Sequence, residues 1–158
     1  MSTRSVIARK TESGFRGVYH HWDGYPSGLG QTLFNVRRWV FGGDTNSMLA
    51  YLIDAHPAGW STVNGCRWFD ARPRCYCHND RNEPPCEMTE ANASGSGCEY
   101  VYVFDAEGSR MTILSSHSGS AKMIGMFGLG DPEAHWVEVK SLDLDSEVEP
   151  EWSAFDGK

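Results

Sequence analysis

A glycine-rich turn that leads into an amphipathic helix is the feature that most constrains the fold of this chain. The turn spans Tyr19–Gln31, and its Asp23-Gly24 pair favours a tight reversal of the backbone. Apolar residues then recur at helical spacing, which predicts a helix over Gly28–Phe41 with Ser27 as its N-cap. The Gly42-Gly43 pair marks the end of this helix. The pattern predicts a strand, a turn and a helix in direct succession.

The rest of the chain predicts an α+β domain. Asp44 or Thr45 is expected to cap a second helix, Asp44–His56, and both helices should pack on one face of a mainly antiparallel sheet. The 158 residues fit a single globular domain, 1–158. Alternating β-forming residues predict an opening hairpin and three later strands: Thr3–Lys10, Phe15–Trp22, Cys98–Asp105, Arg110–Ser116 and Trp136–Lys140.

A long irregular segment, 60–97, separates the helices from the later strands and is rich in cysteine and arginine. Its cysteines and one histidine offer the thiolate and imidazole ligands that zinc prefers, and such a site would hold the loop in place. The alternative is a set of reduced cysteines without metal. The candidate zinc ligands are Cys75, Cys77, His78 and Cys86.

Charge is divided unevenly along the chain, whose net charge is −7. Residues 1–81 hold ten basic against six acidic residues, whereas residues 82–158 hold four against fifteen. The net charge argues against direct binding of nucleic acid. With no apolar run long enough for a membrane span and no signal peptide, the expected location is the cytoplasm.

The acidic C-terminal segment, 141–158, alternates between apolar and acidic residues. We expect its acidic side to face water or a basic partner, after a bulge or bend near Lys140–Ser141. The apolar side would hold Leu142, Leu144, Val148 and Trp152, and the acidic side Asp143, Asp145, Glu147, Glu149 and Glu151.

The Tyr19–Gln31 turn is the predicted binding site, because loops of this composition often carry function. Backbone N–H groups over Gly28–Gly30, ahead of a helix N-terminus, favour an anionic ligand such as a nucleotide. If the protein is instead an enzyme, His20 or His21 would work with Asp23 in acid–base catalysis. The predicted ligand-binding residues are Arg4, His20, His21, Trp22, Asp23, Tyr25, Gly28 and Gly30.

Two stretches of the chain resemble a family of small uncharacterised phage and bacterial proteins. These stretches are Thr3-Arg4-Ser5 and the Trp-Asp-Gly-Tyr-Pro turn at 22–26. The resemblance covers about the first quarter of the chain, and this chain has Ser2 where the family has glycine. It implies phage or mobile-element ancestry, and it brings no catalytic residue with it.

Three functions follow as expectations. The first is a phage-type accessory protein, acting in the host cytoplasm, that binds an anionic small ligand or a host protein at the Tyr19–Gln31 turn without catalysis. The second is a small hydrolase or transferase that uses a histidine with Asp23. The third is an acidic inhibitor of a host nucleic-acid-binding protein, acting through 141–158.

Overall fold

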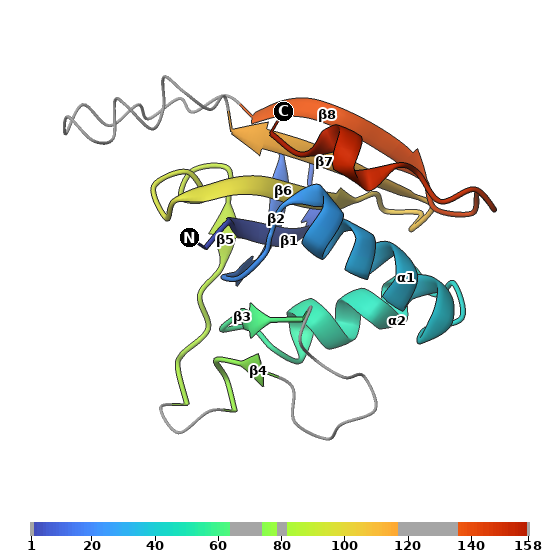
Figure 1. Cartoon of the computed structure of the whole chain (residues 1–158). Coiled ribbons are helices and arrows are strands. Elements are labelled where there is room, and N and C mark those ends of the chain that lie inside the picture. The colour runs from blue at the N-terminus through green and yellow to red at the C-terminus, as the bar shows by residue number, and fades with distance from the viewer. Residues whose placement is uncertain (1, 64–73, 79–81, 117–135, 158) are drawn as a thin grey trace.

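A mixed β-sheet with helices beside it makes up the part of the protein that the computed structural model describes, residues 2–63, 74–78, 82–116 and 136–157 (Figure 1). In these residues, eight strands form one sheet in the order β4-β3-β2-β1-β6-β7-β8, with β5 also paired to β2. The strands are β1 (Arg4–Lys10), β2 (Phe15–His20), β3 (Trp60–Thr62), β4 (Arg74–Cys75), β5 (Met88–Thr89), β6 (Cys98–Phe104), β7 (Arg110–Ser116) and β8 (Trp136–Asp143).

The pairing confirms the predicted fold class, α+β with a mainly antiparallel sheet. The opening hairpin is present as antiparallel β1 and β2, and β6 pairs antiparallel with β7, which pairs antiparallel with β8. Two pairs are parallel: β1 with β6, and β2 with β3. The parallel β1–β6 pair joins the N-terminal hairpin to the later strands in the centre of the sheet.

Both predicted helices form, with boundaries that differ from the expected ones. The first begins as a π-helical turn, Pro26–Gly30, and continues as α1 (Gln31–Trp39). Its N-cap is Tyr25, not Ser27, because proline at the next position starts the helix earlier. The second comprises α2 (Thr45–Leu49) and a π-helical turn, Ala50–Asp54, so it ends before His56. Of the two expected caps, Asp44 is the N-cap, and its side chain accepts a 3.1 Å hydrogen bond from the Ser47 amide.

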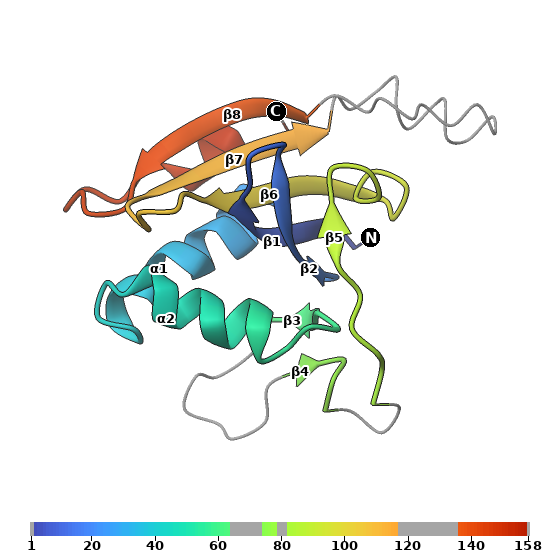
Figure 2. The same cartoon turned by 180° about the vertical axis from the view of Figure 1, so that it is seen from behind.

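Alternating strand residues divide the core between the two faces of the sheet. On the face that we call the helix face, Ile7 and Val18 lie in one cluster with apolar residues of α1 and α2 such as Leu33 and Leu49. On the opposite face, which we call the open face, Val6 and the other strand residues that point to the same side as Val6 pack with Phe15, Met88 and Ala93. Figures 1 and 2 show α1 and α2 side by side.

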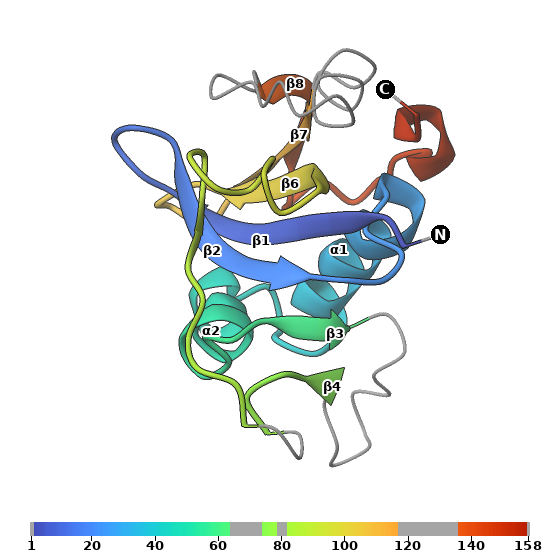
Figure 3. The ribbon, with the colours of Figure 1, turned by 90° about the vertical axis from the view of Figure 1, so that its left-hand side faces the viewer.

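The predicted irregular segment, 60–97, holds three short strands that extend the sheet: β3, β4 and β5. Figure 3 shows β3 and β4 beyond β2, at the edge of the sheet opposite β8. Positions 64–73 and 79–81 of this segment lie outside the described residues.

The C-terminal segment follows the predicted alternation only in part. Leu142, Leu144 and Trp152 are buried as expected, but Val148 is 77% exposed because the chain leaves the sheet after β8. The register of β7 and β8 shifts between Ile113 and Leu114, close to the expected bulge. A short 3₁₀ helix, Trp152–Phe155, then packs beside the start of α1.

The Arg37 side chain joins α1 to this segment from inside the protein. It is 5% exposed, and its guanidinium donates to the Thr45 hydroxyl at 2.6 Å and to the Leu144 carbonyl at 2.9 Å. It also pairs with Asp145 at 2.9 Å and donates to the Gly108 carbonyl at 3.4 Å. Five N–H donors in a planar fork make arginine suited to holding several acceptors at once.

Candidate functional site

The glycines of the Tyr19–Gln31 turn pack against the protein's own atoms. A Cβ added to Gly28 would lie 2.3 Å from the Asp23 carbonyl oxygen, and one added to Gly24 would lie 2.3 Å from Ser5 Oγ. At Gly30, the space for a side chain is taken by the aromatic rings of Tyr102 and Trp152. These glycines therefore allow the turn to pack closely against the rest of the chain, rather than leaving room for a ligand to approach the backbone.

The amides at the start of the first helix also bond within the chain. The Ser27 amide and hydroxyl donate to the two carboxylate oxygens of Asp156, at 2.9 and 2.5 Å. The Gly28 amide donates to the Tyr25 carbonyl, and the Leu29 amide donates to the Asp23 carbonyl. A carboxylate of the protein itself therefore lies where we expected an external anion.

The adjacent histidines separate onto opposite faces of the sheet, as their positions on a strand predict. His20 lies on the helix face, is fully buried, and its Nε2 accepts a 3.0 Å hydrogen bond from the Val63 amide. Burial lowers the pKa of His20 to about 3, and the charge of His21 adds to this effect, so the ring is neutral at physiological pH. Opposite it on β1 is Ser5; neither Ser5 Oγ nor His20 Nδ1 has a hydrogen-bond partner among the described residues.

His21 lies with three aromatic side chains in a group that we call the aromatic platform: Tyr19, His21, Trp22 and Tyr76. The Tyr19 hydroxyl lies 2.6 Å from His21 Nδ1, and the Tyr19 and Tyr76 rings are 6.4 Å apart. The His21 ring meets the Trp22 ring edge to face at 4.6 Å. The structure thus places two predicted ligand residues, His21 and Trp22, in one group with Tyr19, the first residue of the predicted turn. Tyr76 lies far from that turn in sequence and was not among the predicted ligand residues.

A possible metal-binding triad combines a residue that follows the second helix with two residues at β4 and the bend after it. One ligand atom each from His56, Cys75 and His78 falls within 4.8 Å of the other two. Cys75 Sγ and His78 Nδ1 are 3.2 Å apart, and the rings of His56 and His78 are 5.1 Å apart. The 3.2 Å between Cys75 Sγ and His78 Nδ1 is close to the distance between neighbouring ligand atoms around one tetrahedral zinc ion.

The backbone holds His56 in the orientation that a metal ligand needs. Its Nδ1 donates a 2.6 Å hydrogen bond to the Tyr51 carbonyl, which leaves the lone pair on Nε2. Burial lowers the pKa of His56, and the neighbouring His78 also lowers it, although the bond to Tyr51 acts in the opposite direction. A buried, neutral and oriented imidazole is the form of histidine that binds transition metals.

The triad keeps two of the four predicted zinc ligands and replaces the others. Cys77 accepts a 3.1 Å hydrogen bond from the Ala58 amide, and Cys86 is exposed; neither belongs to the triad. His56 was missed because it follows the second helix, about twenty residues before Cys75. In the sequence, the one indication of a role for His56 is its position just before Pro57-Ala58-Gly59, the residues that end the second predicted helix.

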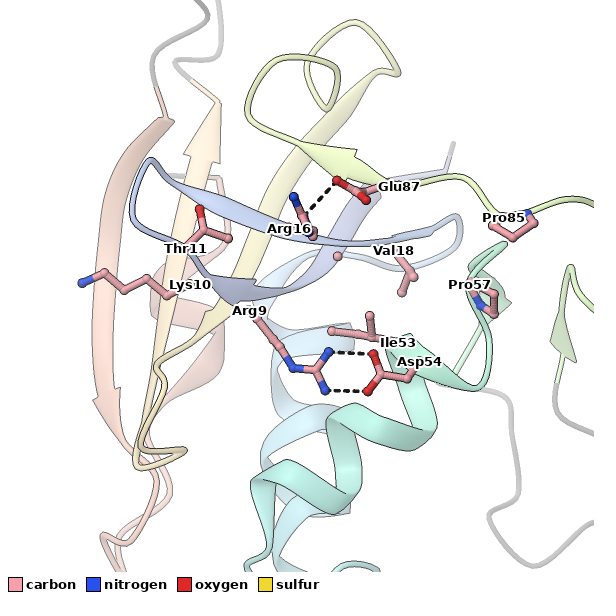
Figure 4. A pocket seen from close by; sticks show the side chains of 11 residues that line it. Arg9, Lys10, Thr11, Arg16, Val18, Ile53, Asp54, Pro57, Pro85 and Glu87 are labelled. Atoms are coloured by element: carbon pink, nitrogen blue, oxygen red, sulfur yellow. Dashed lines mark hydrogen bonds and ion pairs between the residues drawn. The ribbon is translucent and has the colours of Figure 1, made fainter.

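A pocket of about 580 Å³ opens at the far end of the hairpin, between β1, β2 and the Ala50–Asp54 turn (Figure 4). Arg9 and Arg16 face each other across the two strands, and each pairs with a carboxylate. Arg9 makes two 2.8 Å bonds to Asp54, and Arg16 lies 2.9 Å from Glu87. An anion entering this pocket would compete with these carboxylates.

The helices in the described residues include none with the length and apolar character to cross a membrane. Comparison of the chain with protein-family models, with curated proteins and with solved structures gives no match.

Proposed function

We propose that the protein is a zinc-binding domain whose metal centre is the triad of His56, Cys75 and His78. The observation that supports this most directly is the convergence of a thiol and two imidazoles, one of them oriented by the Tyr51 carbonyl. Thiolate and imidazole are the ligands that zinc uses in proteins, and such a mixed set also suits other borderline transition metals.

The triad would add a metal link between two parts of the chain that already meet through the β3–β4 pairing and the bond from the Ala58 amide to Cys77. His56 follows the second helix, whereas Cys75 and His78 belong to the short β4 strand and the bend after it. A two-residue strand has little stability of its own. A metal bound here would fix β4 to the body of the protein, and the three side chains leave a fourth coordination position for water or a further ligand.

Zinc content gives the first test. Protein purified without chelator is expected to contain about one zinc ion per chain by elemental analysis. The variants His56→Ala, Cys75→Ser and His78→Ala should each lose most of that metal. Cobalt-substituted protein should show a thiolate-to-metal charge-transfer band that disappears in Cys75→Ser.

Cys86→Ser is the matched control, because this exposed cysteine lies in the same segment but outside the triad. It should retain the metal content of the parent protein. Metal-free parent protein that takes up no zinc on titration would refute the proposal. So would full zinc content in Cys75→Ser or His56→Ala.

The three functions expected from the sequence, including the phage-type accessory protein that binds a small anion or a host protein, remain predictions. Catalysis by a histidine with Asp23 would have to use His21, since His20 is fully buried. An inhibitor acting through 141–158 would use acidic groups of which several already bind within the chain, among them Asp145 to Arg37, Glu149 to Asn35 and Asp156 to Ser27.

A further inference from the structure

Arg4 begins β1, and the β1–β2 register, in which Ser5 pairs with His20 and Val6 with Tyr19, brings it close to His21 of the aromatic platform. The salt bridges of the described residues do not include Arg4. It is exposed on β1, and its guanidinium rests on Gly97, where an added Cβ would fall 2.6 Å from Nη1. Its positive charge lowers the pKa values of Tyr19 and His21, in each case less than burial changes them. The platform therefore has a guanidinium beside it that is free to bind an anion.

The imidazole of His21 adds a directed donor. Burial raises the pKa of Tyr19 to about 12, so its hydroxyl keeps its proton, and this hydroxyl lies 2.6 Å from His21 Nδ1. In the tautomer whose Nδ1 accepts from this hydroxyl, the neutral ring carries its proton on Nε2, the nitrogen that faces away from the bond. An oxygen of a bound anion can accept from Nε2 and from the Arg4 guanidinium together.

The aromatic rings supply a surface for stacking. Trp22 is 45% exposed, while Tyr19 and Tyr76 are half-buried and held by their neighbours. Aromatic side chains fixed in this way bind planar rings at low cost in conformational entropy. Nucleobases stack on such side chains whatever the base, because each base has a π-face.

We propose that Arg4 and the aromatic platform form a binding site for a nucleoside monophosphate. The base stacks on Trp22 or the tyrosine rings, and the phosphate lies between Arg4 and His21. A single guanidinium and a chain of net charge −7 favour one phosphate over the many of a nucleic-acid strand. This proposal goes beyond zinc binding: none of the residues that would contact the nucleotide is a proposed zinc ligand, and Tyr76 is the one that lies next to a zinc ligand in the chain.

The test is titration of the full chain with the four nucleoside 5′-monophosphates, followed by calorimetry and tryptophan fluorescence. We expect saturable binding of at least one of them. Arg4→Gln should weaken that binding about tenfold and leave the weaker binding of the parent nucleoside unchanged. Trp22→Ala should weaken both by about tenfold, since it removes the stacking surface.

Two matched controls isolate the site. Arg16→Gln removes an exposed arginine from the pocket in Figure 4, and Trp39→Ala removes a tryptophan, 76% exposed, at the end of α1. Both should bind the nucleotide as the parent chain does. The proposal is overturned if no monophosphate binds at millimolar concentration, or if the Arg4 and Trp22 variants bind normally. Tighter, steeply salt-dependent binding of a single-stranded oligonucleotide would also overturn it, in favour of a nucleic-acid site. Because Cys75→Ser tests zinc separately, either proposal can fail alone.

Discussion

Replacing Arg37 by leucine is expected to lower the free energy of unfolding by about 3–5 kcal/mol. The leucine keeps part of the packing volume but removes every donor of a side chain that is 5% exposed. The Leu144 carbonyl then loses the guanidinium that it accepts from in a buried setting. Removing the guanidinium also breaks its ion pair with Asp145, which links α1 to the C-terminal segment.

Chemical denaturation of the variant and the parent chain measures this effect directly. Asp145→Asn is the control, because the Asp145 side chain is 67% exposed and its pairing should contribute less than about 1 kcal/mol. Arg37→Lys keeps the charge without the planar fork and should fall between the two. A loss below about 1 kcal/mol in Arg37→Leu would show that the buried carbonyls find other donors.

Acidification is expected to destabilise the protein through His20. The ordinary pKa of histidine is 6.5 and burial lowers that of His20 to about 3, so between these values the unfolded chain binds a proton that the folded chain does not. The stabilising effect of the neutral ring is complete above pH 6.5 and is lost as the pH falls toward 3. The expected slope is about 1.4 kcal/mol per pH unit within this window.

His20→Gln removes the titration and keeps an oxygen that can accept from the Val63 amide. Between pH 7 and pH 5, the parent chain should lose about 2 kcal/mol more than this variant in urea unfolding. His21→Gln serves as the control, since that ring is partly exposed and should change the pH dependence less. As a second measurement, the NMR shifts of the His20 ring should stay those of a neutral imidazole down to about pH 4; protonation near pH 6.5 would contradict the prediction.

Local patterns in the sequence were enough to predict most of the elements. The alternation of apolar and polar residues identified the β1–β2 hairpin and the β6–β7 pair. Asp44 was a candidate cap because it precedes residues whose apolar side chains recur at helical spacing. These features depend on residues close together in the chain. Sequence reasoning can find them because each needs only the spacing of a few side chains.

The candidate sites were harder to predict, because they depend on which distant segments meet. Asp156 reaches the Ser27 amide across 129 positions, and nothing near Ser27 indicates that an internal carboxylate lies there. His56 joins Cys75 only because β4 pairs with β3. Of the predicted ligand residues, His21 and Trp22 lie in contact, whereas His20 points to the opposite face of the sheet and is buried. Strand alternation predicts that adjacent histidines separate, but it does not predict which of the two faces is buried.

The parallel pairing of β1 with β6 has a consequence for how the chain reaches its native state. Arg9 and Phe104 are partners in this pair, so about ninety residues must be arranged before the first strand gains its second neighbour. Closing so large a loop costs entropy before any contact compensates for it, and folds with such non-local pairing form slowly. We expect the β1–β2 and β6–β7 hairpins to form early in refolding, while the edges of β1 and β6 that pair in the native sheet are still unpaired. The association of these two edges should be the rate-limiting step.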